Sequence, residues 1–103
     1  MELSNIPVNI DADLQELIPK FLDNRRIDIV ALKTFISENE EDAIAHLAHK
    51  IKGSAAGYGF IGLSEMALDI ENALKNHEPE KLPRIADEMA SYLEKIKISY
   101  IAF

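Results

Sequence analysis

The apolar residues of this 103-residue chain recur every three to four positions, and this spacing constrains the fold more than any other feature. Four segments carry the helical period, and no stretch of useful length alternates between apolar and polar residues. The apolar positions of the four segments are Leu22, Ile29, Leu32 and Ile36; Ile44, Leu47, Ala48, Ile51 and Ala55; Leu63, Met66, Ala67, Ile70 and Leu74; and Leu82, Ile85, Ala86, Met89, Leu93, Ile96 and Tyr100. The pattern predicts an all-α protein.

The first two helices have recognisable starts. Pro19 suits the first turn of a helix, where a missing N–H costs little, and Arg25 then interrupts that helix's apolar stripe. We expect the shorter piece Ala12–Ile18 ahead of it to form a separate turn or helix. Glu41 and Asp42, preceded by Glu40, put negative charge at the start of the second helix, which is favourable against the helix dipole.

The connections between the predicted helices are short. A turn at Asn76–Pro79 separates the third helix from the last, and Pro83 falls in the first turns of the last helix. Short connections between helices of similar length favour antiparallel neighbours. We therefore predict an antiparallel up-down four-helix bundle with a short extra N-terminal helix or turn, forming a single domain over residues 1–103.

The charge balance excludes several classes of partner. The net charge is −7, and the 11 basic residues are scattered and outnumbered by 18 acidic ones. Binding to nucleic acid or to an anionic membrane needs a basic face, so neither is expected. The chain has no cysteine, which excludes disulfides and thiolate metal sites. The absence of cysteine also fits a cytoplasmic protein, which is what we expect. The chain shows no secretory signal and no transmembrane run.

All four glycines lie between His49 and Gly62, in the stretch HKIKGSAAGYGFIG. The letters from Gly57 to Gly62 satisfy G-x-G-x-x-G, but a dinucleotide site needs a strand before the first glycine and a βαβ unit around it. The preceding residues here are helical by pattern. We interpret Gly57, Gly59 and Gly62 as the reversal between two helices. The letters KGSAAG are not a P-loop either, so no ATP site is visible.

His49 stands apart from the core stripe of the second helix. The apolar positions of that helix fall within about 60° of one direction, whereas His49 lies roughly 140° away, on the exposed side. Gly53 follows at i+4, although glycine costs about 1 kcal/mol against alanine inside a helix. The physical reason that we infer for this glycine is clearance, because a large group can then approach the imidazole.

Two charged residues complete the predicted arrangement around His49. Lys52 at i+3 lies on the same flank and can reach an anion attached to the ring. If the chain reverses near Gly59, residue 71 comes opposite residue 49, and that residue is Glu71. Its carboxylate could accept the Nδ1–H of His49 and leave Nε2 free as a nucleophile.

Blander interpretations of His49 stay open at this point. A single histidine on a helix surface is commonly a solvated polar residue. His46 and His49 could form half of a metal site, but bundle sites need further inward-facing carboxylates or histidines, and we expect no metal. His77 lies in a turn and is incidental. No Ser–His–Asp arrangement can be argued.

The stretch AHKIKGSAAGYGFIGL resembles the signature of histidine-containing phosphotransfer (HPt) domains. In that signature a histidine is followed by K-G-S at the third to fifth positions and by a glycine at the tenth, and His49, Lys52, Gly53, Ser54 and Gly59 match position by position. The similarity extends upstream to LIPKFLDNRRIDIVAL and downstream to Glu71, so it covers most of the chain.

The resemblance implies an antiparallel four-helix bundle that relays phosphoryl groups between aspartates of receiver domains and has no kinase activity alone. It implies that His49 is phosphorylated, that Lys52 pairs with the phosphoryl oxygens, that Gly53 provides access and that Gly59 shapes the turn. Position 71 is often glutamine in the family, where it hydrogen-bonds the histidine. Glu71 departs from this pattern, because a carboxylate orients the ring but repels a phosphoryl group. Ala55 and Ala56 replace small polar residues often found there.

The implied partners are response-regulator receiver domains and a hybrid sensor kinase. No cofactor of this chain's own is expected, because the divalent metal would come from the receiver domain. We expect a monomer, and Met1 together with the absence of a linker tail favours a free-standing protein. The alternative is a non-catalytic helical adaptor or decoy that binds a receiver domain without accepting phosphate.

Overall fold

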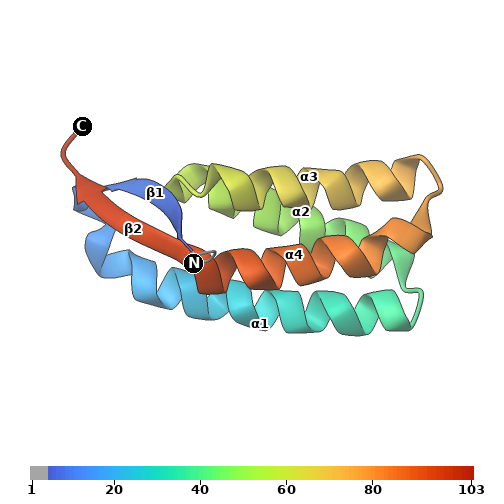
Figure 1. Ribbon diagram of the computed structural model, residues 1–103. Coiled ribbons are helices and arrows are strands. Elements are labelled where there is room, and N and C mark those ends of the chain that lie inside the picture. Colours follow the sequence, from blue (N-terminus) through green and yellow to red (C-terminus); the bar gives the residue numbers. More distant parts are fainter. Residues whose placement is uncertain (1–4) are drawn as a thin grey trace.

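The four predicted helices are all present in the computed structural model, which describes residues 5–103. They are α1 (Ile18–Ser37), α2 (Glu41–Tyr58), α3 (Ile61–Lys75) and α4 (Leu82–Lys95). In Figure 1 they lie side by side, with the connection from α2 to α3 at one end and the other two connections at the opposite end. Contacts join α1 to α2 and α4, and α3 to the same two helices, so the bundle closes around one core.

The helix starts agree with the local signals in the sequence. Ala12–Leu17 forms a separate 3₁₀ helix ahead of α1, and Pro19 lies in the first turn of α1. Glu41 and Asp42 occupy the first turn of α2, and Pro83 that of α4. The two prolines lie where a missing N–H costs little, and the two acidic residues lie where negative charge is favourable against the helix dipole.

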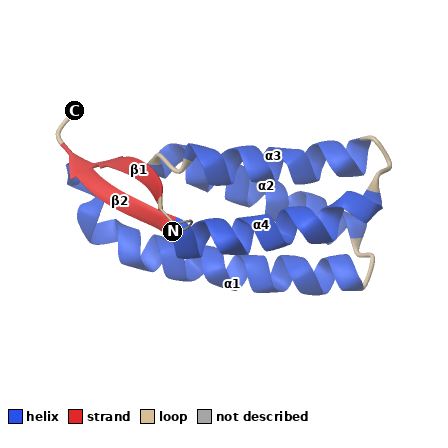
Figure 2. Cartoon of the chain, in the orientation of Figure 1, coloured by secondary structure: helices blue, strands red, loops and turns tan. Residues whose placement is uncertain are grey.

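The all-α prediction is wrong at the two ends of the chain. Ile6–Asp11 forms strand β1 and Ile96–Ile101 forms strand β2, and the two pair in parallel from Ile6 opposite Ile96 to Asp11 opposite Ile101 (Figure 2). The periodicity predicts Ile96 and Tyr100 as part of the last helix, which instead ends at Lys95. Two residues four apart lie on one face of a helix and also on one face of a strand, so this pair could not distinguish the two. The intervening residues could, because IKISYI alternates in burial and is rich in β-branched side chains.

The core is built from the apolar stripes that the periodicity predicts. All five predicted positions of α2 are buried, as are most of those on α3 and α4, while Leu22, Ile36, Met66 and Leu74 are half-buried at the edge. The ring of Phe21 on α1 stacks against those of Tyr58 and Phe60, with centroids 4.6 and 5.0 Å apart. These aromatic contacts hold the start of α1 against the turn between α2 and α3. Within residues 5–103, no helix is both long and apolar enough to cross a membrane.

The turn between α2 and α3 determines which residues of the two helices meet. Gly59 ends α2 with a φ of 100°, a left-handed conformation in which glycine is unstrained. Beyond the turn, Ser64 Oγ donates to the carbonyl oxygen of Lys52 at 2.9 Å. Residues later along α3 contact residues earlier along α2, so this pair folds back on itself. The reversal brings Glu71 alongside His49.

Candidate functional site

His49 lies on the solvent side of α2, midway along the helix. Its side chain is 75% exposed, while Leu47, Ala48 and Ile51 on the same helix are buried in the core. The wheel position predicted from the sequence is therefore correct. His49 Nδ1 lies 3.2 Å from Oε2 of Glu71 on α3. A carboxylate oxygen can only accept here, so the contact favours the tautomer with the proton on Nδ1 and leaves the lone pair on Nε2.

Glu71 also binds Lys52. Lys52 Nζ lies 2.6 Å from Glu71 Oε1, so each carboxylate oxygen contacts a different side chain of α2. The Glu71 side chain is only 23% exposed. Burial by itself raises the pKa of this carboxyl group, but hydrogen bonds from Lys52 and His49, and their charges, outweigh it and hold the pKa below its ordinary value. Glu71 is therefore ionised throughout the neutral range.

Gly53 faces open space. A Cβ added at this position would meet no atom within 4 Å, and the residue lies inside α2 without a positive φ. Gly62 differs, because a Cβ there would lie 2.7 Å from Cε2 of Tyr92. Packing therefore requires glycine at position 62 and does not require it at position 53. An open space one helical turn above His49 is consistent with the predicted role in access.

A buried ion pair supports the other flank of α2, and the sequence interpretation missed it. Arg25 and Asp28 on α1 lie with Nε and Oδ2 2.9 Å apart, and their side chains are 8% and 11% exposed. Neither atom has a hydrogen bond of good geometry, so the attraction between the two charges compensates for their burial. Arg25 Nη1 donates to Ser54 Oγ at 2.6 Å, and Lys50 Nζ lies 3.3 Å from Asp28 Oδ1. The sequence feature that could have revealed this ion pair is Arg25 within the apolar stripe of the first helix, with Asp28 three residues later.

Among the described residues, neither of the other two histidines makes a hydrogen bond or ion pair with His49, Lys52 or Glu71. His46 is exposed on α2, and His77 lies in the turn after α3 with a φ of 57°. Among residues 5–103, no group of three or more histidine, aspartate and glutamate side chains is arranged to hold a metal ion.

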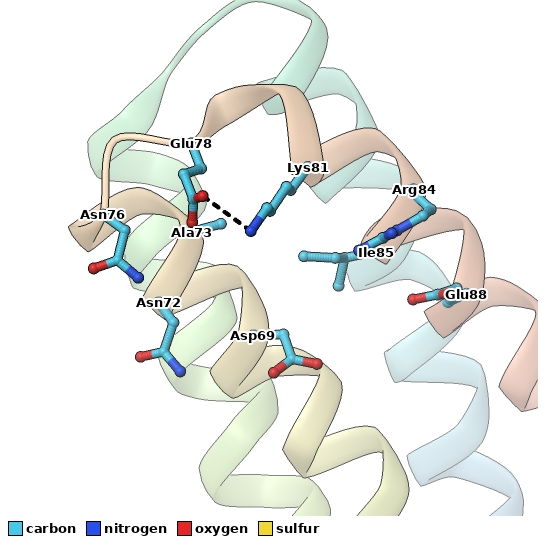
Figure 3. Close-up of a pocket in the computed structure, with 9 residues that line it drawn as sticks. All are labelled: Asp69, Asn72, Ala73, Asn76, Glu78, Lys81, Arg84, Ile85 and Glu88. Atoms are coloured by element: carbon cyan, nitrogen blue, oxygen red, sulfur yellow. Dashed lines mark ion pairs between the residues drawn. The ribbon is translucent and has the colours of Figure 1, made fainter.

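A polar cleft of about 300 Å³ lies between α3 and α4, at the end of the molecule where these helices are connected. Figure 3 shows Asp69 and Asn72 on one side and Arg84 and Glu88 on the other, with the ion pair between Glu78 and Lys81 at the top. None of the residues that line it belongs to α2. The cleft is therefore distinct from the His49 arrangement.

Comparisons with known proteins identify the family. The family model described as the Hpt domain matches residues 16–98, a segment that contains all four helices together with His49, Lys52, Gly53 and Glu71. Searches of curated proteins and of solved structures gave no match. Because the matched segment covers most of the chain, the protein belongs to the Hpt domain family, and this membership implies histidine phosphotransfer in two-component signalling.

Proposed function

We propose that this protein is a phosphoryl carrier that relays a phosphoryl group between aspartates of receiver domains through His49. The observation that carries the proposal is an exposed histidine whose Nδ1 contacts a carboxylate 3.2 Å away. Nε2 is then the free nucleophilic nitrogen. Lys52 is within reach of the same carboxylate, and Gly53 leaves space above the ring. An antiparallel arrangement of the four helices would provide a rigid support for these groups.

In the proposed reaction, Nε2 attacks the phosphorus of an aspartyl phosphate in line. A P–N bond forms as the P–O bond breaks, and the aspartate leaves as a carboxylate. Lys52 offsets part of the charge of about −2 that the phosphoryl group adds. The divalent cation that stabilises the transition state would be bound by the receiver domain. The partners would be receiver domains and a hybrid sensor kinase in the cytoplasm, and this chain would act as a monomer.

The first experiment tests whether His49 accepts phosphate. The purified protein is mixed with phosphorylated receiver domains, and the label is followed on the chain. We expect an acid-labile, base-stable phosphate on the wild type and none on His49→Gln. His46→Gln is the matched control, because His46 is also exposed on α2 and should be dispensable. A wild-type protein that binds a receiver domain yet never becomes labelled would instead indicate the adaptor alternative.

The second experiment tests the role of Lys52. Lys52→Ala should slow labelling while leaving the helix content unchanged, because its ammonium lies beside the same Glu71 carboxylate that contacts His49. Lys50→Ala is the matched control, since Lys50 is held by Asp28 on the other flank. Equal labelling rates for Lys52→Ala and the wild type would disprove the role assigned to Lys52.

A further inference from the structure

Glu71 is the one anionic side chain among the described residues that contacts the His49 ring. Its Oε2 lies 3.2 Å from His49 Nδ1, and its Oε1 is held by Lys52 at 2.6 Å. The Glu71 side chain is mostly buried, so the lysine fixes a partly desolvated carboxylate against one nitrogen of the ring. The contact involves the nitrogen that does not carry the phosphoryl group in the proposed reaction. It therefore remains available after phosphorylation.

The Nδ1 proton matters most when the phosphoryl group leaves His49. If Nδ1 carries a proton, the P–N bond breaks, its electron pair returns to Nε2, and neutral imidazole is the leaving group. A P–O bond forms to the accepting aspartate, and the total charge is conserved. If Nδ1 is deprotonated, the same cleavage must expel imidazolate, a much poorer leaving group. Onward transfer therefore requires a proton on Nδ1.

We propose that Glu71 retains the Nδ1 proton on phosphorylated His49 and so keeps the phosphoryl group ready for onward transfer at neutral and mildly alkaline pH. This inference rests on the proposed function, because it concerns the phosphorylated state of the same histidine. Glu71 is a positioning residue in this scheme, since it acts through the ring and contacts no transferred atom.

The other charged groups around His49 do not replace Glu71. On α2, Lys52 binds Glu71, Lys50 pairs with Asp28 of α1, and His46 lies one turn before His49. Lys75 on α3 lies one turn beyond Glu71. Apart from Glu71, these charged side chains of α2 and α3 are the cations Lys50, Lys52 and Lys75. Those cations oppose a positive charge on the ring, so the carboxylate is the group that favours it.

The size of the effect follows from the exchange of a carboxylate for a carboxamide. Glu71→Gln keeps an oxygen that can accept the Nδ1–H, but it removes the negative charge. An opposite charge in direct contact favours the protonated form of a ring nitrogen, and a change of one pH unit in a titration midpoint is a tenfold change in proton binding. For a one-unit difference, loss of phosphate at a pH above both titration midpoints should be about tenfold slower in Glu71→Gln than in wild type.

The experiment uses a background in which His49 is the single histidine, made by His46→Gln and His77→Gln, because the chain has 3 histidines. Phosphoramidate, a small phosphodonor, labels His49 without a receiver domain. The Nδ1 proton is titrated by nitrogen-15 NMR, and phosphate loss is measured from pH 5 to 9. We expect the Glu71→Gln midpoint to lie about one unit lower, with slower phosphate loss at pH 8 and equal loss at pH 5.

Glu65→Gln is the matched control, because it removes the same charge from an exposed position on α3 that has no contact with His49. It should titrate like the background protein. Coincident midpoints for Glu71→Gln and the background, or an equal shift in Glu65→Gln, would overturn the inference. Failure of the proposed function would look different: His49 would show the shift with phosphoramidate but exchange no phosphate with receiver domains.

Discussion

Replacing Gly53 should separate the stability of the protein from its activity. Gly53 lies inside α2, and a Cβ at this position would meet nothing within 4 Å. Gly57 offers a matched control, since it lies in the same helix and also faces open space. Neither glycine has a positive φ, so alanine or leucine can be placed at either position without backbone strain.

The stability effect can be estimated from helix propensity. Alanine is favoured over glycine inside a helix by about 0.8–1.0 kcal/mol, and somewhat less near a helix end such as position 57. For a domain of this size 1 kcal/mol corresponds to a shift of roughly 4–8 °C in Tm. Gly53→Ala and Gly57→Ala should therefore both melt a few degrees above wild type, as measured by circular dichroism.

The effect on phosphotransfer should differ between the two positions. A helical side chain leans toward the N-terminus and covers the turn before its own Cα, so a leucine at position 53 would extend toward His49. We expect Gly53→Leu to be labelled by a phosphorylated receiver domain at least tenfold more slowly than wild type. This corresponds to a rise of about 1.4 kcal/mol in activation free energy. Gly57→Leu should transfer at the wild-type rate.

Two results would refute this reasoning. If Gly53→Leu accepts phosphate as fast as wild type, the space above His49 serves no approach to the ring. If Gly53→Ala melts below wild type while Gly57→Ala does not, a side chain at position 53 is opposed by packing, and the position does not face open space. A slow but stabilised Gly53→Leu would support the role of Gly53 in access.

Three further predictions concern stability. Gly62→Ala should unfold about 1–3 kcal/mol more easily in urea, because its Cβ would lie 2.7 Å from the buried Tyr92 ring; unchanged stability would show that the ring moves aside freely. Asp28→Asn should cost about 3–5 kcal/mol by leaving buried Arg25 without its anion, and a loss below 1 kcal/mol would show that the pair is solvated. The free energy of unfolding of wild type should exceed that of Glu71→Gln by its full amount above the unfolded-state pKa of about 4.5. This difference should disappear as the pH falls through the lower folded-state pKa of Glu71. A difference that persists at the lowest pH would contradict this assignment.

Much of the candidate site could be predicted from the sequence because its parts are local. His49, Lys52 and Gly53 lie within two turns of one helix, so a regular helix determines their relative positions. Glu71 is on a different helix, but the reversal at Gly59 is tight, and counting an equal number of residues from the turn led to the correct position. The contact then follows at 3.2 Å.

Other features could not be predicted because they depend on contacts between distant segments. Ile6 pairs with Ile96, and each strand is so short that its sequence alone does not distinguish it from a helix or a loop. Arg25 looked like an interruption of an apolar stripe until the structure placed Ser54 of α2 2.6 Å from it. A buried charge is tolerated only with a partner; Asp28 three residues later on α1 is visible in the sequence, whereas nothing local in α1 indicates the second partner, Ser54, on α2.

The sequence by itself determined the four helices, the exposed position of His49 and the match to the family signature, because periodicity and local spacing are properties of single segments. The tertiary structure alone decided that the two chain ends pair as strands and that Arg25 is buried. It also decided that one carboxylate, Glu71, binds both His49 and Lys52. The physical reason is that strand pairing, charge burial and a shared carboxylate all depend on distances between separate elements, which only the packed bundle determines.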